Sequence, residues 1–214
     1  LAASEAGVDV VDCAMDAFSG STSQPCLGSV LETLQNTERV SSVRIDEVRD
    51  ISNYWLTVRK QYSAFDQGVT FPASEVYLHE MPGGQFTNLL SQAKSLGLTD
   101  KWPEIAKTYS DVNQLFGDIV KVTPSSKVVG DMALLMISQG LTKEQVQDPK
   151  IKVAFPESVL DMLRGNLGQP PGGFPKSIVK KALGEGEIFT GRPGSRIKQK
   201  SLDKVKIEAC SNLS

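Results

Sequence analysis

Side chains that can donate protons and hydrogen bonds gather at one corner of this sequence, between residues 118 and 131. An apolar run there ends at Thr123, Pro124 follows, and Ser126 and Lys127 come shortly after. Proline fixes its own φ and has no N–H, so it suits a turn or the first position of a helix. The hydroxyls of Thr123 and Ser126, together with the cation of Lys127, would then stand at a helix mouth. Backbone donors favour developing negative charge at such a place.

A helix over residues 127–138 is expected to position these groups. Its apolar side chains recur at spacings of three and four, which places them on one face of a helix. They are Val128, Val129, Met132, Leu135 and Met136. Ser125 or Ser126 is expected to cap the free N–H groups at the start of the helix. The alternative is that this corner is only a well-capped helix start with no chemistry of its own.

Composition narrows the class of protein. Of the 214 residues, 40% are hydrophobic, and a net charge of -2 gives no electrostatic case for nucleic acid or an anionic membrane as partner. No apolar run approaches the roughly 18 residues that span a bilayer. An odd set of three cysteines without metal-ligand spacing fits reduced thiols, so an intracellular compartment is expected. The single histidine, His79, cannot build a site of several imidazoles and is expected to be structural.

The first 45 residues follow the order of an α/β unit. Residues 7–15 form a short apolar run after a glycine, which predicts a buried strand of a parallel sheet. A Gly/Ser/Thr-rich loop at 19–25 and a helix around 29–34 follow, the order found in α/β barrels and doubly wound sheets. No second strand of this quality is near, and a lone parallel strand is unstable in water. We therefore expect the chain to be the C-terminal part of something larger, with a segment missing before Leu1.

The remainder is predicted to be mostly helical. A helix over 46–65, with Asp46 as N-cap, carries an apolar stripe expected to be core. The Met-Pro-Gly-Gly-Gln segment at 81–85 permits a tight backbone to which another group can come close. Further helices are predicted at 87–96, 103–116, 156–167 (with Pro156 first) and 176–183, and a short helical turn capped by Thr142 is predicted at 142–146. The remaining elements are a loop at 67–74, an extended segment at 75–78, a linker at 184–200 and a tail too short to fold alone.

Several of these stretches together resemble the carboxyltransferase domain of the pyruvate carboxylase family. They are 6–12, 19–25, 54–55, 62–65, 80–89, 92–97, 117–130, 155–159, 168–173 and 192–194. The resemblance covers the chain to about residue 201, and residues 207–214 do not look like the family's continuation. It implies an α/β remnant followed by mostly α structure. Residues 1–45 would be the last strand and helix of a TIM-type barrel, 46–183 a helical funnel-like extension, and 184–214 a linker and tail.

The resemblance also implies an activity. In that family carboxybiotin, made from ATP and bicarbonate in a separate domain, transfers its carboxyl group to pyruvate and gives oxaloacetate. The resemblance places the proton-shuttling threonine at Thr123 and the partners of the biotin ureido group at Ser126 and Lys127. A hydroxyl suits this role because it can accept one proton while giving another. Donors from Ser126 and Lys127 would stabilise charge on the ureido oxygen, as in an oxyanion hole.

Other parts of the family's site are expected outside this chain. The resemblance places the ligands of a divalent metal (Zn or Mn), a carbamylated lysine and the arginine that holds pyruvate upstream of Leu1, and ATP in another domain. No metal ligand is therefore assigned here, and the isolated chain is expected to be inactive. The expected partners are pyruvate and a carboxybiotin carrier domain, in a full-length homotetramer of the cytoplasm or mitochondrial matrix. Two alternatives stay open: a carboxyltransferase subunit of oxaloacetate decarboxylase or transcarboxylase, and a non-catalytic helical interaction module.

Overall fold

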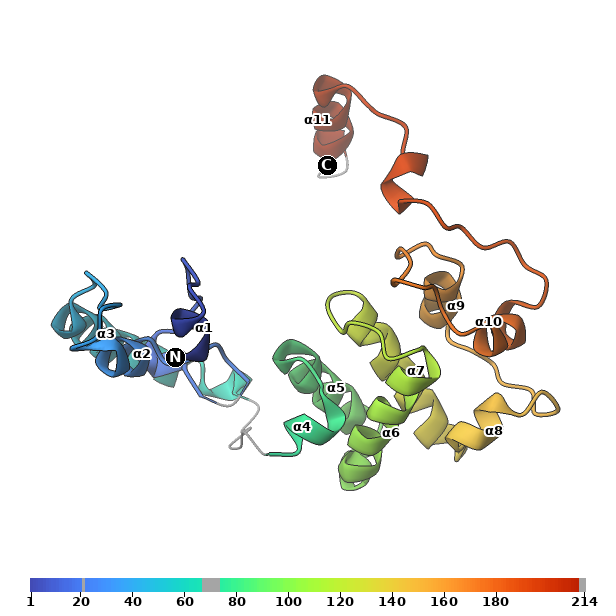
Figure 1. Ribbon diagram of the computed structural model, residues 1–214, viewed down its shortest axis with the longest axis horizontal. Helices are drawn as coiled ribbons and strands as arrows, with labels where there is room; N and C mark the ends of the chain where they lie inside the picture. The colour runs from blue at the N-terminus through green and yellow to red at the C-terminus, as the bar shows by residue number, and fades with distance from the viewer. Residues whose placement is uncertain (21, 67–73, 212–214) are drawn as a thin grey trace. The chain divides into compact units, whose positions relative to one another are not determined.

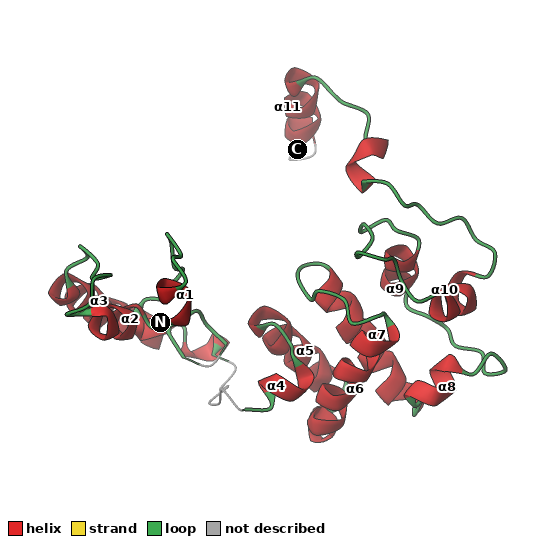
Figure 2. Ribbon diagram, viewed as in Figure 1, coloured by secondary structure: helices red, strands yellow, loops and turns green. Residues whose placement is uncertain are grey.

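The computed structural model describes residues 1–20, 22–66 and 74–211. These residues form helices joined by loops, and none of them belongs to a named strand (Figure 2). The chain divides into two compact units, Leu1–Gly97 and Leu98–Ser214, which are described separately. Within the described ranges, no helix has both the length and the apolar character that crossing a membrane requires. The expectation of a mostly helical chain is confirmed.

The first unit contains short helical turns and a few longer helices, of which α3 and α5 are the longest (Figure 1). They are α1 (Ala2–Glu5), the 3-10 turn η1 (Asp16–Phe18), α2 (Leu27–Leu34), α3 (Ile45–Gln61), η2 (Ser63–Phe65), α4 (Val76–His79) and α5 (Gly83–Ser95). The loop predicted at 67–74 lies outside the described residues except for Ser74, and the loop at 19–25 is described except at residue 21.

The described residues do not form the strand predicted at 7–15. Only one parallel bridge forms, between Ala14 and Cys26. The N–H of Ala14 donates to the carbonyl of Pro25 at 2.8 Å, and Ala14 accepts from the N–H of Leu27 at 2.9 Å. A parallel strand needs hydrogen-bond partners along its whole length, and none of the described segments supplies them. The apolar run therefore stays exposed, with Val10 at 77%.

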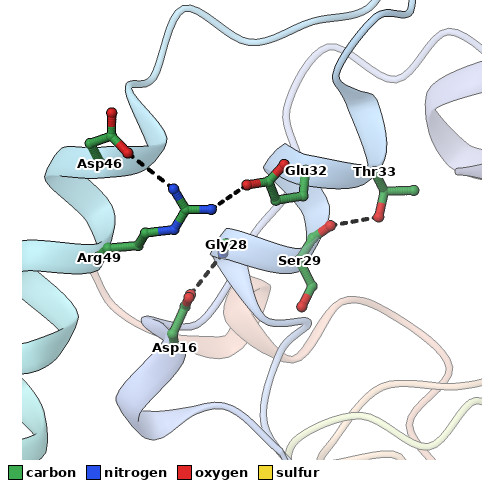
Figure 3. Close-up of polar contacts among 7 residues, drawn as sticks. All are labelled: Asp16, Gly28, Ser29, Glu32, Thr33, Asp46 and Arg49. Atoms are coloured by element: carbon green, nitrogen blue, oxygen red, sulfur yellow. Dashed lines mark hydrogen bonds and ion pairs between the residues drawn. The ribbon is translucent and has the colours of Figure 1, made fainter.

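Polar contacts hold α2 and η1 to the chain around them (Figure 3). The guanidinium of Arg49 on α3 bridges Glu32 on α2 and, at 3.0 Å, Asp46 in its own first turn. The carboxylate of Asp16 accepts from the N–H of Gly28 at 2.7 Å, where it meets the free donors at the start of α2. Asp46 is therefore not the predicted N-cap: Arg44 holds that position, and the Asp46 carboxylate pairs with Arg49 instead.

The apolar stripe of α3 was predicted to be core, but most of it is exposed. The exposed fraction of Val48 is only 4%, whereas those of Ile51 and Tyr62 are 47% and 58%. Trp55 makes edge-on ring contacts with Phe18 at 5.7 Å and with Tyr54. Among the described residues of this unit, α3 packs mainly against η1 and α2 and to a smaller extent against η2, and these elements leave much of its stripe uncovered. The helical periodicity was therefore correct, while the burial inferred from it was not.

The second unit is built around two long helices, α6 (Trp102–Leu115) and α7 (Ser125–Gln139), which pack along each other (Figure 1). Of the other elements, η3 (Thr99–Lys101) and α8 (Lys143–Gln147) contact α6, and α9 (Glu157–Leu163) contacts α7. The helix α10 (Lys176–Leu183) packs on α8 and α9, and η4 (Pro193–Arg196) and α11 (Leu202–Ser211) follow it in the chain. The side of α7 predicted to face the core does so: Val128, Val129, Met132 and Met136 are at most 2% exposed, and only Leu135 is half-buried. The tail forms the helix α11, which buries no residue.

Several helix ends differ from the prediction for local reasons. The start of α5 is Gly83, four residues before the predicted start, because Pro82 takes the N-cap and the two glycines adopt helical angles. The segment 75–78 is helical in α4, not extended. Pro156 is the N-cap of α9 and not its first helical residue as predicted, and the helix ends at Leu163 instead of residue 167. Thr142 forms the predicted cap as part of a capping box with Gln145, and α10 has the predicted bounds.

Gly165, just after α9, generates a stability prediction. Its φ is +83°, and a Cβ there would lie 2.0 Å from the carbonyl oxygen of Phe189, whose N–H donates to the carbonyl of Arg164 at 2.8 Å. Gly165→Ala should therefore lower the free energy of unfolding by about 2–4 kcal/mol, because backbone must move and φ is strained.

Gly140→Ala is the matched control for this substitution. Gly140 also has a positive φ of +66°, but a Cβ there would meet open space. It should cost only about 1 kcal/mol. Denaturant unfolding of the 214-residue chain measures both variants, and equal costs would show that the Phe189 contact does not constrain this loop.

Candidate functional site

The structure brings two of the three predicted site residues to the surface and buries the third. Pro124 is the N-cap of α7, so Thr123 lies just before the helix while Ser126 and Lys127 lie in its first turn. Thr123 is exposed, and the side chain of Lys127 is 59% exposed. Ser126 is only 6% exposed. An exposed hydroxyl and an exposed ammonium group therefore lie four residues apart at one end of α7.

Neither serine caps α7, contrary to the prediction. The hydroxyl of Ser125 lies 2.8 Å from the carbonyl oxygens of both Val120 and Val122 and accepts from the N–H of Val122. The side chain thus ties the preceding loop to the helix. The N–H of Ser126 donates to Val122 and that of Lys127 to Pro124, each at 3.1 Å. With these backbone donors engaged, a negatively charged group here would be met chiefly by side chains.

The loop that carries Thr123 is fastened at its beginning to the end of α6. Gly117 and Asp118 have φ values of +94° and +55°, which reverse the chain directly after the helix. The side-chain amide of Asn113 donates to the carboxylate of Asp118 at 2.7 Å, and the Asp118 N–H donates back to the carbonyl of Asn113. The loop therefore leaves α6 in a fixed direction.

Tyr109 on α6 holds the first turn of α7. Its ring is fully buried, and its hydroxyl donates to the backbone carbonyl of Ser126 at 3.2 Å. Burial raises the pKa of the Tyr109 hydroxyl, so the group remains a protonated donor. Sequence reasoning did not identify this contact, because the two residues are 17 positions apart and no local pattern connects them.

The ammonium group of Lys127 has a carboxylate partner that the sequence analysis also missed. Its Nζ lies 2.7 Å from Oδ2 of Asp131, one turn further along α7. The hydroxyl of Ser158 on α9 donates to the same oxygen at 2.7 Å. A spacing of four residues between opposite charges on a predicted helix was the available signal for Asp131. No local signal could have indicated Ser158.

The Pro-Gly-Gly stretch in the first unit has the predicted close approach. A Cβ on Gly83 would lie 2.4 Å from the backbone oxygen of Thr22, whose hydroxyl pairs with that of Thr87 at 3.1 Å. The loop at 19–25 thus packs on the start of α5. Gln85 in the same turn is 6% exposed, and its Nε2 has no hydrogen-bond partner among the described residues.

Among the described residues, neither a cluster of metal-binding side chains nor the cavity described below lies at Thr123. Within the described ranges, no group of three His, Cys, Asp or Glu side chains could hold a metal ion. A cavity of about 430 Å³ lies beside α9 and α10, and none of the three predicted site residues lines it. The glycine-rich stretch at 168–173 does contribute to that cavity, through Gln169 and Gly173.

Comparison with known proteins settles the family. A family model described as the conserved carboxylase domain matches residues 76–213. This chain belongs to that family. The chain is 46% identical over 204 residues to pyruvate carboxylase of Bacillus subtilis and 45% identical over 212 residues to that of Aspergillus niger. These matches cover 95% and 99% of the chain. The chain spans only 18% of the length of each relative, and the activity of those proteins belongs to their full length.

Solved structures agree with this assignment. The carboxyl transferase domain of Rhizobium etli pyruvate carboxylase with pyruvate and biocytin is 58% identical, with a TM-score of 0.92 over 99% of this chain and 36% of that one. The complete multifunctional enzyme from the same organism gives a TM-score of 0.93. The resemblance to the carboxyltransferase domain is confirmed. The family match also extends to residue 213, so the prediction that residues 207–214 depart from the family is wrong.

The buried side chain of His79 generates a pH prediction. The side chain is 6% exposed, its Nδ1 accepts from the N–H of Met81 at 2.9 Å, and burial lowers its pKa below the ordinary value of 6.5, with Glu75 opposing this in part. Below that value the unfolded chain takes up a proton that the folded chain does not. The contribution of neutral His79 to the free energy of unfolding should therefore be complete above pH 6.5. It should be lost as the pH falls through the lower pKa of the folded state.

His79→Asn is the matched variant, because the asparagine oxygen can replace Nδ1 as acceptor and does not titrate. Thermal unfolding between about pH 7.5 and pH 5.5 should show a flatter pH dependence for the variant than for the parent chain. Parallel curves would mean that His79 titrates alike in the folded and unfolded states.

Proposed function

We propose that this chain is part of a biotin-dependent carboxylase that transfers the carboxyl group of carboxybiotin to pyruvate and forms oxaloacetate. The observation that carries the proposal is that Thr123 and Lys127 are both exposed, four residues apart, at the start of α7. Membership of the conserved carboxylase domain family supports it, as does the likeness to a carboxyl transferase domain bound to pyruvate and biocytin.

Thr123 is proposed to move the proton. A threonine hydroxyl is too weak a base to remove a methyl proton alone, so acceptance and donation must be coupled. The Oγ1 atom takes a proton from the methyl group of pyruvate while its own proton passes to the ureido nitrogen of biotin. The carbon freed in this way would form the new bond to the carboxyl carbon. The bond between that carboxyl carbon and the ureido nitrogen would break, which leaves the nitrogen to hold the proton given by Thr123. A carboxylate at this position could not donate in the same step.

Lys127 and Ser126 are proposed to hold the biotin ureido oxygen. Donors aimed at an oxygen on which negative charge develops stabilise the transition state, and an ammonium group is a strong donor of this kind. Ser126 offers little of its surface, so its hydroxyl should contribute less than Lys127. The residues present thus fit the ureido group through one exposed cation and one mostly buried hydroxyl.

The finer architecture is part of the same proposal. Residues 1–45 would end a TIM-type barrel, 46–183 would form the helical extension, and 184–214 a linker and tail. The isolated parallel bridge at Ala14 and the exposed Val8, Val10 and Val11 support a strand that pairs with chain beyond these residues.

The setting of the enzyme is proposed from the family resemblance. A divalent metal and ATP would be bound by parts of the complete enzyme outside this chain, and a carrier domain would bring the biotin. The complete enzyme would be a homotetramer in the cytoplasm or the mitochondrial matrix. The three cysteines are free thiols in the described structure, which supports a reducing compartment.

Substitution of Thr123 in the complete enzyme that carries this chain tests the proposal. Thr123→Ala should lower the rate of oxaloacetate formation by at least about 100-fold, because the shuttling hydroxyl is lost. Thr123→Ser, which keeps the hydroxyl, should stay within about tenfold of the parent. Thermal unfolding should change little for either variant, since loss of one exposed hydroxyl costs only about 1 kcal/mol or less.

The contrary result is equally clear. A Thr123→Ala enzyme that forms oxaloacetate at the parental rate would rule out the proton-shuttle role. If that enzyme had instead lost contact with another protein or domain, a non-catalytic interaction role would be favoured.

A further inference from the structure

We propose that Asp131, held by Ser158, is a positioning residue that fixes the ammonium group of Lys127 for the biotin ureido oxygen. This inference rests on the proposed function, because it assigns a purpose to the partner of a proposed biotin-binding lysine. Asp131 is not itself proposed to touch biotin or pyruvate; it acts through Lys127.

The contacts form a short chain from solvent to the packed helices. Lys127 is 59% exposed, whereas the Asp131 side chain is only 19% exposed. Oδ2 of Asp131 receives both the Lys127 ammonium and the Ser158 hydroxyl, each at 2.7 Å. Ser158 stands beside Val159, which is fully buried where α9 packs on α7. The ammonium group at the end of the exposed Lys127 side chain is therefore held, through Asp131 and Ser158, to the packed helices α7 and α9.

Helix electrostatics alone do not account for this arrangement. Lys127 lies in the first turn of α7, the end at which the helix dipole disfavours a cation. Its partner lies C-terminal to it, which is the weaker of the two orders for a pair four residues apart. An exposed lysine in this place therefore adds little to helix stability. A requirement for a cation at this end of α7 explains its position better.

The arrangement leaves donors for a ligand. An ammonium group has three N–H bonds, and the described contacts use one of them, to Asp131. Two donors remain on an exposed group whose flexible stem is restrained at its tip. Restraint before binding reduces the rotamer entropy that is lost when the ligand is held. Asp131 should therefore strengthen biotin binding without taking part in proton transfer.

A purely structural role predicts something different. If the three side chains only join α7 to α9, removal of the Asp131 charge would lower thermal stability and leave biotin binding by the folded enzyme unchanged. The two roles are separated by the kinetics of the proposed reaction in reverse, in which free biotin accepts the carboxyl group of oxaloacetate and pyruvate is released. Free biotin then has its own KM, measurable apart from kcat.

Five variants of the complete enzyme that carries this chain make the test: Lys127→Met, Asp131→Asn, the double variant of these two, Ser158→Ala and Glu157→Gln. Asp131→Asn should raise the KM for free biotin about tenfold with kcat changed less than about threefold, the pattern of lost binding in both ground and transition states. In the Lys127→Met background the same substitution should have no further effect, because Asp131 acts through Lys127.

Glu157→Gln is the control on the same helix as Ser158. It removes the ion pair of Glu157 with Arg164, whose nearest atoms are 2.6 Å apart, and leaves Asp131 and Lys127 intact. Its KM for biotin should equal that of the parent. Ser158→Ala should give the KM effect of Asp131→Asn at smaller size, about twofold to threefold, because the charge remains.

The outcomes distinguish this inference from the function beneath it. An unchanged KM for Asp131→Asn, or effects of the two single variants that multiply in the double variant, would overturn the positioning role. Parental turnover in both Lys127→Met and Thr123→Ala would instead overturn the proposed function, and the inference with it. An unchanged KM in Ser158→Ala would contradict the part of the proposal that assigns a role to α9.

Discussion

The buried contact between α6 and α7 is the constraint on which the second unit depends. Tyr109 and Val112 of α6, with Val129 and Met132 of α7, are fully buried. Each such side chain contributes on the order of 1.5–3 kcal/mol relative to exposure, so this contact fixes the direction of α7 firmly. The Tyr109 hydroxyl extends that constraint to the backbone of Ser126, and the Asn113–Asp118 contact extends it to the loop ahead of Thr123. The candidate site therefore lies at the end of a rigid element.

Polar contacts at this corner fall into two groups with different consequences. The backbone carbonyl groups of Val122 and Pro124 accept from the N–H groups of Ser126 and Lys127 at the start of α7, so few backbone donors remain there for a ligand. The side chains of Thr123 and Lys127 are left exposed, and Lys127 is restrained by a mostly buried carboxylate. A site of this kind relies on side-chain donors fixed before binding more than on the helix dipole.

The sequence predicted what local patterns encode. The apolar spacing of α7, the capping box at Thr142 and the bounds of α10 all follow from interactions within one or two turns. Contacts between distant positions were not predictable: Ser158 reaches Asp131 across 27 positions. The strand expected at 7–15 failed for a related reason, because a strand is defined by its partners, and a short apolar run carries no information on whether they are present.

One structure would test the central claim most directly: the complete carboxyltransferase domain that carries this chain, crystallised with pyruvate and biocytin. We predict that Oγ1 of Thr123 lies within about 3.5 Å of both the methyl carbon of pyruvate and a ureido nitrogen of the biotin group, the range of near-attack contacts. A Thr123 hydroxyl more than about 6 Å from either atom, with both ligands bound and the domain closed around them, would contradict the account.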